Sequence, residues 1–213
     1  MSLVIGVVSQ KGGVGKSTVS RLIACNYAAS EWQVKIADMD LAQGTCTSWN
    51  RRRLQNGTDP KVAVEQFVNV PDALKMASQY DLIVFDGAPH STRMTLDIAQ
   101  ASDMVILPTG VSIDDLEPTI NLAHELKKNK VPLSKIALAF TRVGNSDLEV
   151  AEATEYVNAS GYHLLDGVIH EKTAIRRASD EGKCATETPY KSISEKVDIL
   201  VQSIVNRVNA LKK

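Results

Sequence analysis

The sequence is short of the residues that mark secreted, zinc-binding and membrane-spanning proteins. Its 213 residues contain three cysteines, which form no Cys-x-x-Cys pair, and no histidine stands close enough to complete a zinc pattern. We expect buried thiols in a reducing cytosol at Cys25, Cys46 and Cys184. The chain has no run of about 18 apolar residues and no basic-then-apolar leader. These absences predict a cytoplasmic protein without stable membrane insertion.

The sequence also lacks an excess of charge of either sign. It has 24 Lys and Arg against 25 Asp and Glu, so any contact with DNA must come from a local basic patch. Aromatic residues are few and are not interleaved with the basic clusters, so DNA contacts would be to phosphates and independent of sequence. Clusters of this kind are more often just a solvated helix face, which is the alternative for each of them. The clusters are Arg51-Arg52-Arg53, Lys127-Lys128 with Lys130, Arg176-Arg177 and Lys212-Lys213.

Apolar and helical segments alternate along the chain. Short, continuous, β-branched runs predict strands at Leu3 to Val8, Val34 to Ala37, Val62 to Val64, Leu82 to Phe85, Met104 to Leu107, Ile136 to Phe140 and Leu164 to Ile169. Three- and four-residue spacing predicts helices at Ser17 to Ala29, Thr45 to Arg53, Val70 to Gln79, Thr92 to Ala101, Ile113 to Lys128, Asp147 to Ala159 and Lys191 to Leu211. The pattern predicts an α/β fold, a mostly parallel sheet covered on both faces, in one domain spanning residues 1–213.

A glycine-rich stretch lies between the first apolar run and the first helix. It consists of Lys11, Gly12, Gly13, Val14, Gly15, Lys16, Ser17 and Thr18. Glycines let backbone N–H groups turn towards phosphates, Lys16 reaches the β- and γ-phosphates, and Ser17 can ligate Mg²⁺. A second lysine, Lys11, stands at the loop entrance, next to Gln10 where the general pattern has glycine. The stretch predicts a binding site for a nucleoside triphosphate.

Acidic residues follow two of the predicted strands, at the sheet edge where parallel sheets bind ligands. Asp86 ends an apolar run and precedes a glycine, as a Walker B aspartate does, and Asp86 to Pro89 is a candidate switch segment. Asp38 and Asp40 are two residues apart, so they should point to the same side of an extended chain. Near Mg-ATP they would orient a water molecule and complete the shell of the metal. A helix cap at Asp86 and solvated acids at the other two positions remain alternatives.

Arg142 follows the predicted strand Ile136 to Phe140 and is a candidate to border a purine base. The alternative for a lone arginine at a strand end is a surface salt bridge of little energetic value.

Together these residues make the sequence resemble the ParA/MinD group of deviant Walker A ATPases, most closely the short ParA-type plasmid partition ATPases. The matching elements are the deviant loop Lys11 to Thr18, the Asp38 to Asp40 element followed by Trp49, the Walker B acid Asp86, Pro108 after the next strand, and Thr141-Arg142. The resemblance covers nearly the whole chain.

The resemblance implies specific roles for these residues. Lys11 would reach the phosphates of the partner subunit when two ATP-bound monomers dimerise, and Lys16 and Asp40 would complete the catalytic set. Asp38 and Asp86 would serve the Mg²⁺ shell, with Ser17 as a direct ligand. Such ATP-bound homodimers bind DNA without sequence preference, and a ParB-like, centromere-binding adaptor stimulates their slow hydrolysis. The expected role is segregation of a plasmid or other cargo on the nucleoid.

The sequence departs from this group in two places. The segment Asp40-Leu41-Ala42-Gln43 lacks the usual proline, and Ile169-His170-Glu171-Lys172 replaces the usual Ile-Pro-Arg or Asp-Arg. Arg176 and Arg177 then become the local candidates for DNA binding, in a polar stretch, His170 to Lys183, without a clear periodic pattern. The short N-terminus predicts no separate helix-turn-helix domain and no operator binding.

Two other classes of function compete with this reading. A MinD-like membrane-surface ATPase would use the amphipathic last helix as its anchor, although bulky Trp or Phe anchors are missing. A metabolic enzyme of related fold is the other class. An iron-sulfur reductase would need cysteines in Asp86 to Ala99 or Met104 to Asp115, and a bacterial tyrosine kinase would need a tyrosine-rich tail; the sequence has neither.

Overall fold

The central feature of the computed structural model, which describes residues 2–90 and 92–212, is one seven-stranded sheet. The strands are β1 (Leu3–Val7), β2 (Val34–Asp38), β3 (Ala63–Gln66), β4 (Leu82–Asp86), β5 (Met104–Thr109), β6 (Ile136–Val143) and β7 (His163–His170). Their order is β3-β2-β4-β1-β5-β6-β7, and every described pair is parallel. The predicted parallel α/β fold is confirmed.

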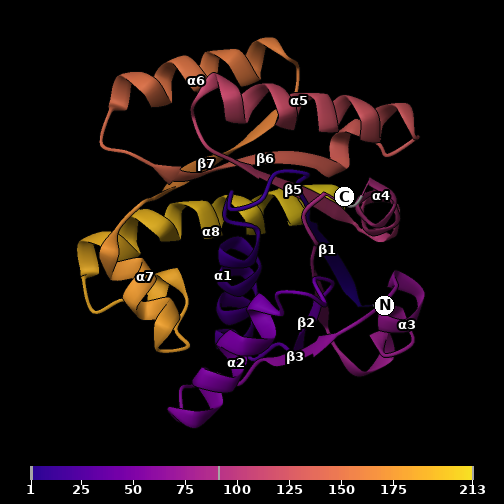
Figure 1. The fold of residues 1–213 in the computed structure, drawn as a ribbon, viewed down its shortest axis with the longest axis vertical. Helices are drawn as coiled ribbons and strands as arrows, with labels where there is room; N and C mark the ends of the chain where they lie inside the picture. Colours follow the sequence, from indigo (N-terminus) through magenta and orange to yellow (C-terminus); the bar gives the residue numbers. More distant parts are fainter. Residues whose placement is uncertain (1, 91, 213) are drawn as a thin grey trace.

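Helices cover both faces of the sheet (Figure 1). They are α1 (Lys16–Ala29), α2 (Thr45–Gln55), α3 (Val70–Leu74), α4 (Thr92–Ala101), α5 (Ile113–Lys128), α6 (Asp147–Ala159), α7 (Thr173–Asp180) and α8 (Lys191–Leu211). One hydrophobic core joins the sheet to α1, α2, α7 and α8, and the other joins it to α3, α4, α5 and α6. Parallel strands covered on both faces read as continuous apolar runs, which is why the sequence located most of them.

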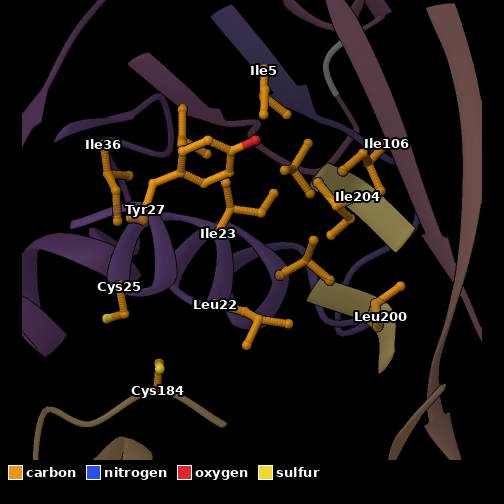
Figure 2. Close-up of a cluster of buried hydrophobic side chains, with 14 of the residues drawn as sticks. Ile5, Leu22, Ile23, Cys25, Tyr27, Ile36, Ile106, Cys184, Leu200 and Ile204 are labelled. Carbon is orange, nitrogen blue, oxygen red and sulfur yellow. The ribbon is translucent and has the colours of Figure 1, made fainter. Parts of the chain in front are cut away.

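Successive strand residues alternate between the two cores. In β1, Ile5 and Val7 belong to the core under α1, while Val4 packs on the opposite side. Figure 2 shows the first of these cores, in which residues of the sheet face residues of α1 and α8. The sheet contributes Ile5, Ile36 and Ile106, α1 contributes Leu22 and Ile23, and α8 contributes Leu200 and Ile204. The three cysteines are free and buried, as expected.

Two local predictions were wrong, and one helix was not predicted. The helix expected over Val70 to Gln79 breaks after Leu74 and resumes as a 3₁₀ turn at Ala77–Gln79. Between the two pieces the sulfur of Met76 accepts a hydrogen bond from Lys35 of β2, which ties the break to the sheet. In the polar stretch after β7, the structure has the eight-residue helix α7. Strand β6 continues through Arg142, so this arginine lies within the strand.

The basic clusters also divide into different environments. Arg51 is exposed, but Arg53 is fully buried and donates to Glu187, Gly182 and Pro60. A solvated helix face therefore does not describe the whole triplet. Lys212 lies with its ammonium 5.7 Å from the ring centre of Trp32. Lys213 lies outside the described residues.

The Arg53–Glu187 pair is a bidentate ion pair in a largely buried setting. Both guanidinium–carboxylate contacts are 2.8 Å, and the Glu187 carboxylate also accepts from the backbone N–H of Cys184. Burial alone would raise the pKa of Glu187, but the hydrogen bonds from Arg53 and Cys184 outweigh it and the pKa is lowered. A carboxyl with a lowered folded-state pKa adds stability above its unfolded value, and this stability is lost as the pH falls through the folded value.

We predict that Glu187→Gln lowers the free energy of unfolding by roughly 2 kcal/mol at pH 7, because it leaves a buried guanidinium without its counter-charge. The difference from the unmodified chain should begin to shrink below the ordinary carboxyl pKa of 4.5 and disappear only once the pH has fallen through the lower folded-state pKa of Glu187. Urea denaturation over a series of pH values, from pH 7 down to the acid limit of folding, measures this. Glu181→Gln, in an exposed pair with Lys183, is the control and should change little. An equal loss at every pH would contradict the role of the ion pair.

Candidate nucleotide-binding site

The glycine-rich loop connects β1 to α1, and the helix begins at Lys16. Gly15 has a left-handed backbone conformation, with φ 91°, and a Cβ there would lie 3.2 Å from the side chain of Thr141. Both the conformation and the contact require glycine. The hydroxyl of Thr141 also donates to the carbonyl of Val14 at 2.6 Å. The loop is therefore held against β6, and the first N–H groups of α1 are left for an anion.

The loop and two of the predicted acids surround one cavity of about 240 Å³. Among the described residues, its lining consists of Gly12, Gly13, Gly15, Lys16, Ser17, Thr18, Arg21, Asp40, Gln43, Thr45, Asp86, Gly87 and Pro89. A larger cavity, of about 760 Å³, lies near the amino ends of the strands around Trp32 and Tyr80. Ligands of parallel α/β sheets bind at the carboxyl edge, so we place the candidate site in the smaller cavity.

Lys16 is buried next to two carboxylates. Burial lowers the pKa of its ammonium group, and the charges of Asp86 and Asp40 raise it again in part. The ammonium donates to the carbonyl of Lys11 at 3.2 Å. A buried lysine at the start of a helix concentrates positive charge where the phosphates of a nucleotide would lie.

Asp86 ends β4 and is only 2% exposed. Its Oδ1 accepts from the hydroxyl of Ser20 at 2.9 Å, and its Oδ2 accepts from the thiol of Cys46 at 3.1 Å. Burial raises the pKa of Asp86, although hydrogen bonds from Ser17, Cys46 and Ser20 act in the opposite direction. Burial and the nearby carboxylate raise the pKa of the Cys46 thiol, which therefore keeps its proton and acts as a donor.

Asp38 and Asp40 were expected to point to the same side of the chain, but the structure gives the two carboxylates different environments. Asp40 is half-buried and lines the cavity, and its Oδ1 accepts from the N–H of Gln43 at 3.0 Å. Asp38 is fully buried, and its carboxylate accepts from Asp40 N–H and from the N–H and hydroxyl of Thr47. Asp38 thus fixes the Asp40 loop and the start of α2. Its expected place at the metal stays a prediction.

Lys11 lies outside the cavity. Its side chain is 45% exposed, and its ammonium contacts the carboxylate of Asp115 and the carbonyl of Asp114 at the start of α5. The lysine therefore stands at the lip of the site, away from the phosphate region of its own loop.

Arg142 contacts the glycine loop from outside. It has a φ of 56°, and its guanidinium donates to the carbonyl of Gly13 at 2.9 Å and lies 3.5 Å from the carboxylate of Glu171. The structure thus shows the surface salt bridge that was the alternative to a purine contact, together with a hydrogen bond to the backbone of the loop. A place beside a purine base stays a prediction.

The predicted switch segment Asp86 to Pro89 begins in close contact with β1. The N–H of Gly87 donates to the carbonyl of Val7 at 3.0 Å, and a Cβ at Gly87 would lie 3.0 Å from the side chain of Val8. This glycine therefore permits a close approach of two strands. Movement of the segment stays a prediction.

Two contributors to the site were missed by sequence reasoning. Arg21 is 6% exposed, lines the cavity, and donates to the carbonyl of Thr45 at 2.8 Å and to the hydroxyl of Ser179 at 2.7 Å. It follows Ser17 by four residues, so helical spacing was a signal for it. Cys46 had no such signal, because its contact with Asp86 depends on how α2 packs.

The match to known proteins agrees with this geometry. The model of the CobQ/CobB/MinD/ParA nucleotide binding domain matches residues 5–185. The chain belongs to this family. The predicted ParA/MinD-type ATPase is thereby confirmed at the level of the family.

Individual relatives include the maintenance of carboxysome distribution protein A of Gloeobacter kilaueensis, which is 29% identical over 208 residues, 92% of this chain and 94% of the relative. A putative plasmid partition protein of Borrelia burgdorferi B31, solved with AMPPNP, has a TM-score of 0.73 at 19% identity. The match covers 97% of this chain and 100% of that protein's chain. The pNOB8 ParA, solved with nonspecific DNA, has a TM-score of 0.65 at 16% identity, with 97% and 99% coverage of the two chains. These two structural likenesses establish the fold alone.

Within residues 2–90 and 92–212, no helix combines the length and the apolar character needed to cross a membrane.

We predict that Gly15→Ala destabilises the protein by about 1–3 kcal/mol, because alanine in a left-handed conformation is strained and its Cβ presses on Thr141. Displacement of the loop should also weaken nucleotide binding by about tenfold or more. Thermal unfolding and titration with a fluorescent nucleotide measure the two effects. Gly144→Ala is the control, since a Cβ there meets no described atom within 4 Å. A Gly15→Ala protein that binds nucleotide normally would contradict the role of the loop.

Proposed function

We propose that this chain is an ATPase that hydrolyses Mg²⁺-bound ATP, dimerises in its ATP-bound form and positions a cargo along DNA. The observation that carries the proposal is the convergence of Lys16, Asp40 and Asp86 on one cavity beside the glycine loop. These groups come from three separate segments of the chain, and the fold brings them to one sheet edge. Phosphoryl transfer to water requires a cation that binds the phosphates, an acid that serves the metal and an acid that solvent can reach. Lys16, Asp86 and Asp40 would supply these three groups.

The residues around the cavity fit ATP and Mg²⁺ by their chemistry. Backbone N–H groups of the loop and Lys16 would hold the phosphates, while Ser17 and Asp86 supply the oxygen ligands that Mg²⁺ prefers. Bound Mg²⁺ would neutralise charge that develops on the phosphates. Asp40, which is half-buried and borders the cavity, would orient the attacking water. Asp38 would act indirectly, by holding the Asp40 loop.

Lys11 supports action between two subunits. Its ammonium group is held by Asp115 outside the cavity, at an exposed position that a second molecule can approach. A lysine that served only its own nucleotide would be expected inside the cavity with Lys16. We therefore propose that Lys11 contacts the nucleotide of the partner in an ATP-dependent homodimer.

We further propose that the dimer binds nonspecific DNA through α7, where Arg176 and Arg177 are exposed. The C-terminal end of α7 is tied to α2 by hydrogen bonds from Arg52 to Ser179 and from Asn56 to Glu181. Because α2 starts at the Asp40 loop, nucleotide-dependent changes there can reach the basic face. The relatives that act on carboxysome distribution and plasmid partition support a positioning role, served by a ParB-like adaptor, with a plasmid or another assembly as cargo.

The membrane-surface alternative loses support from the packing of α8. The apolar stripe that would insert into a lipid surface, including Val197, Leu200, Ile204 and Val208, is buried against the sheet. Using that stripe as an anchor would require the helix to leave its own core, at the cost of the hydrophobic free energy of burial.

We predict that Lys11→Ala abolishes the ATP-dependent shift from the 23.1 kDa monomer to a species of about twice that mass. Sedimentation velocity with ATP and Mg²⁺ measures the shift. Asp40→Ala is the matched control, because it should lose turnover while it retains nucleotide and the dimer. An unchanged dimer in Lys11→Ala would remove this lysine from the subunit interface.

The experiment that decides the proposed function compares two surfaces. ATP with Mg²⁺ should retain the protein on nonspecific DNA, and retention should fall steeply as salt rises, since the contacts are to phosphates. Replacing Arg176 and Arg177 together with alanine should weaken retention about tenfold or more at fixed salt. Binding to anionic liposomes without binding to DNA would favour the membrane-surface function instead.

A further inference from the structure

Cys46 occupies an unusual place for a thiol, inside the candidate active site. It lies in the first turn of α2, is fully buried, and its sulfur is 3.1 Å from Oδ2 of Asp86. The sulfur is also 4.0 Å from the carbonyl of Ser17, at the limit of a sulfur hydrogen bond. A thiol carries one proton, so the shorter contact to Asp86 is the one it satisfies.

The contact matters because hydrogen bonds to both carboxylate oxygens of Asp86 prevent this buried side chain from rotating. Ser20 holds one oxygen from α1, and Cys46 holds the other from α2. Both donors are neutral, so they orient the carboxylate without neutralising its charge. A buried polar atom that loses its hydrogen-bond partner is destabilised because it has also lost its hydration, which favours another side-chain rotamer.

The position of Cys46 is itself fixed by the second acid of the site. The carboxylate of Asp38 accepts both the N–H and the hydroxyl of Thr47, the residue after Cys46. Asp38 ends β2, and Asp86 ends the neighbouring strand β4 at the same register position. The start of α2 therefore connects two adjacent strand ends through Asp38, Thr47, Cys46 and Asp86.

We propose that Cys46 is a positioning residue that orients Asp86 for Mg²⁺-dependent nucleotide binding. The inference rests on the proposed function, in that it requires Asp86 to serve the metal. The Cys46 thiol is fully buried and does not line the cavity, so it would act only through the carboxylate of Asp86. Residues that orient a metal-binding group in this way commonly change metal affinity when they are replaced.

The test measures how binding of a fluorescent, non-hydrolysable ATP analogue depends on the Mg²⁺ concentration. Cys46→Ala should raise the Mg²⁺ concentration for half-maximal binding by about 3- to 10-fold, the range that one hydrogen bond corresponds to. Cys46→Ser, which keeps a donor, should stay within about twofold of the unmodified chain. Affinity for the analogue in EDTA should be the same in all variants, since the phosphate loop is untouched.

Cys25→Ala is the matched control, because Cys25 is a buried thiol of α1 in the hydrophobic core facing Cys184 (Figure 2). It should lose packing as Cys46→Ala does, without a change in Mg²⁺ dependence. If Cys46→Ala does not fold, as judged by thermal unfolding, Cys46→Val fills the space without a donor and is compared with Cys46→Ser.

Asp86→Asn separates failure of this inference from failure of the proposed function. If Asp86→Asn leaves the Mg²⁺ dependence unchanged, Asp86 does not serve the metal and both fail. If Asp86→Asn shifts it while Cys46→Ala and Cys46→Val do not, the inference alone is overturned. A Cys46→Ser protein as impaired as Cys46→Ala would also overturn it, because the hydrogen bond would then not be the cause.

Discussion

Burial of the parallel sheet on both faces is the constraint on which the rest of the structure depends. Charged groups cannot remain unpaired within such strands, so the chemistry of the molecule collects where strands end. Lys35 is the instructive exception in the middle of β2. Lys35 is 4% exposed, and its ammonium group is stabilised by an ion pair with Glu65. It also lies over the aromatic rings of Phe67 and Tyr80. The acids at strand ends have their partners in helices that pack against the sheet: Asp38 in α2, and Asp86 in α1 and α2.

Helix α2 is the element that joins these strand ends to the rest of the molecule. Cys46, Trp49 and Arg53 are spaced by three and four residues, so they share one face of the helix. The first contacts Asp86, the second donates to the carbonyl of Lys183, and the third pairs with Glu187. One helix face thus runs from the candidate nucleotide site to the segment that follows α7. The helix therefore links the packing of these two regions.

The sequence predicts the parts of this arrangement that depend on local pattern. Continuous apolar runs and the spacing of Gly13, Gly15 and Lys16 are properties of short segments, and the sheet, the loop and most helices follow from them. Asp38 and Asp40 show the limit of such reasoning. Their alternation is correct for an extended chain, but Asp38 is the last residue of β2, and Asp40 lies beyond the strand, next to a turn that begins at Leu41. Which acid enters the cavity is decided by the hydrogen bonds of Thr47, which no local pattern records.

Arg53 and α7 were missed for a related physical reason. A run of three arginines reads as a solvated surface, because burying one is unfavourable unless its donors are satisfied. Here the acceptors come from Pro60, Gly182 and Glu187, up to 134 residues away. Helix α7 is short and buries only Ile175 and Ala178, too few apolar positions to establish a period. Contacts between distant segments supply what local propensity does not.

The resting place of Lys11 bears on how a nucleotide would change the molecule. Its contact with Asp115 joins an exposed lysine to a partly exposed carboxylate, with side chains 45% and 24% exposed, so water and salt screen it and the pair is worth about 0–1 kcal/mol. The triphosphate of a bound nucleotide carries several negative charges against the single charge of Asp115. The lysine can therefore leave Asp115 at little cost in free energy when such a group is presented at the lip of the cavity. Lys16, buried and held by the carbonyl of Lys11 and the two acids, has no comparable freedom. The two lysines of the loop are thus physically distinct, one fixed inside its own site and one available to another.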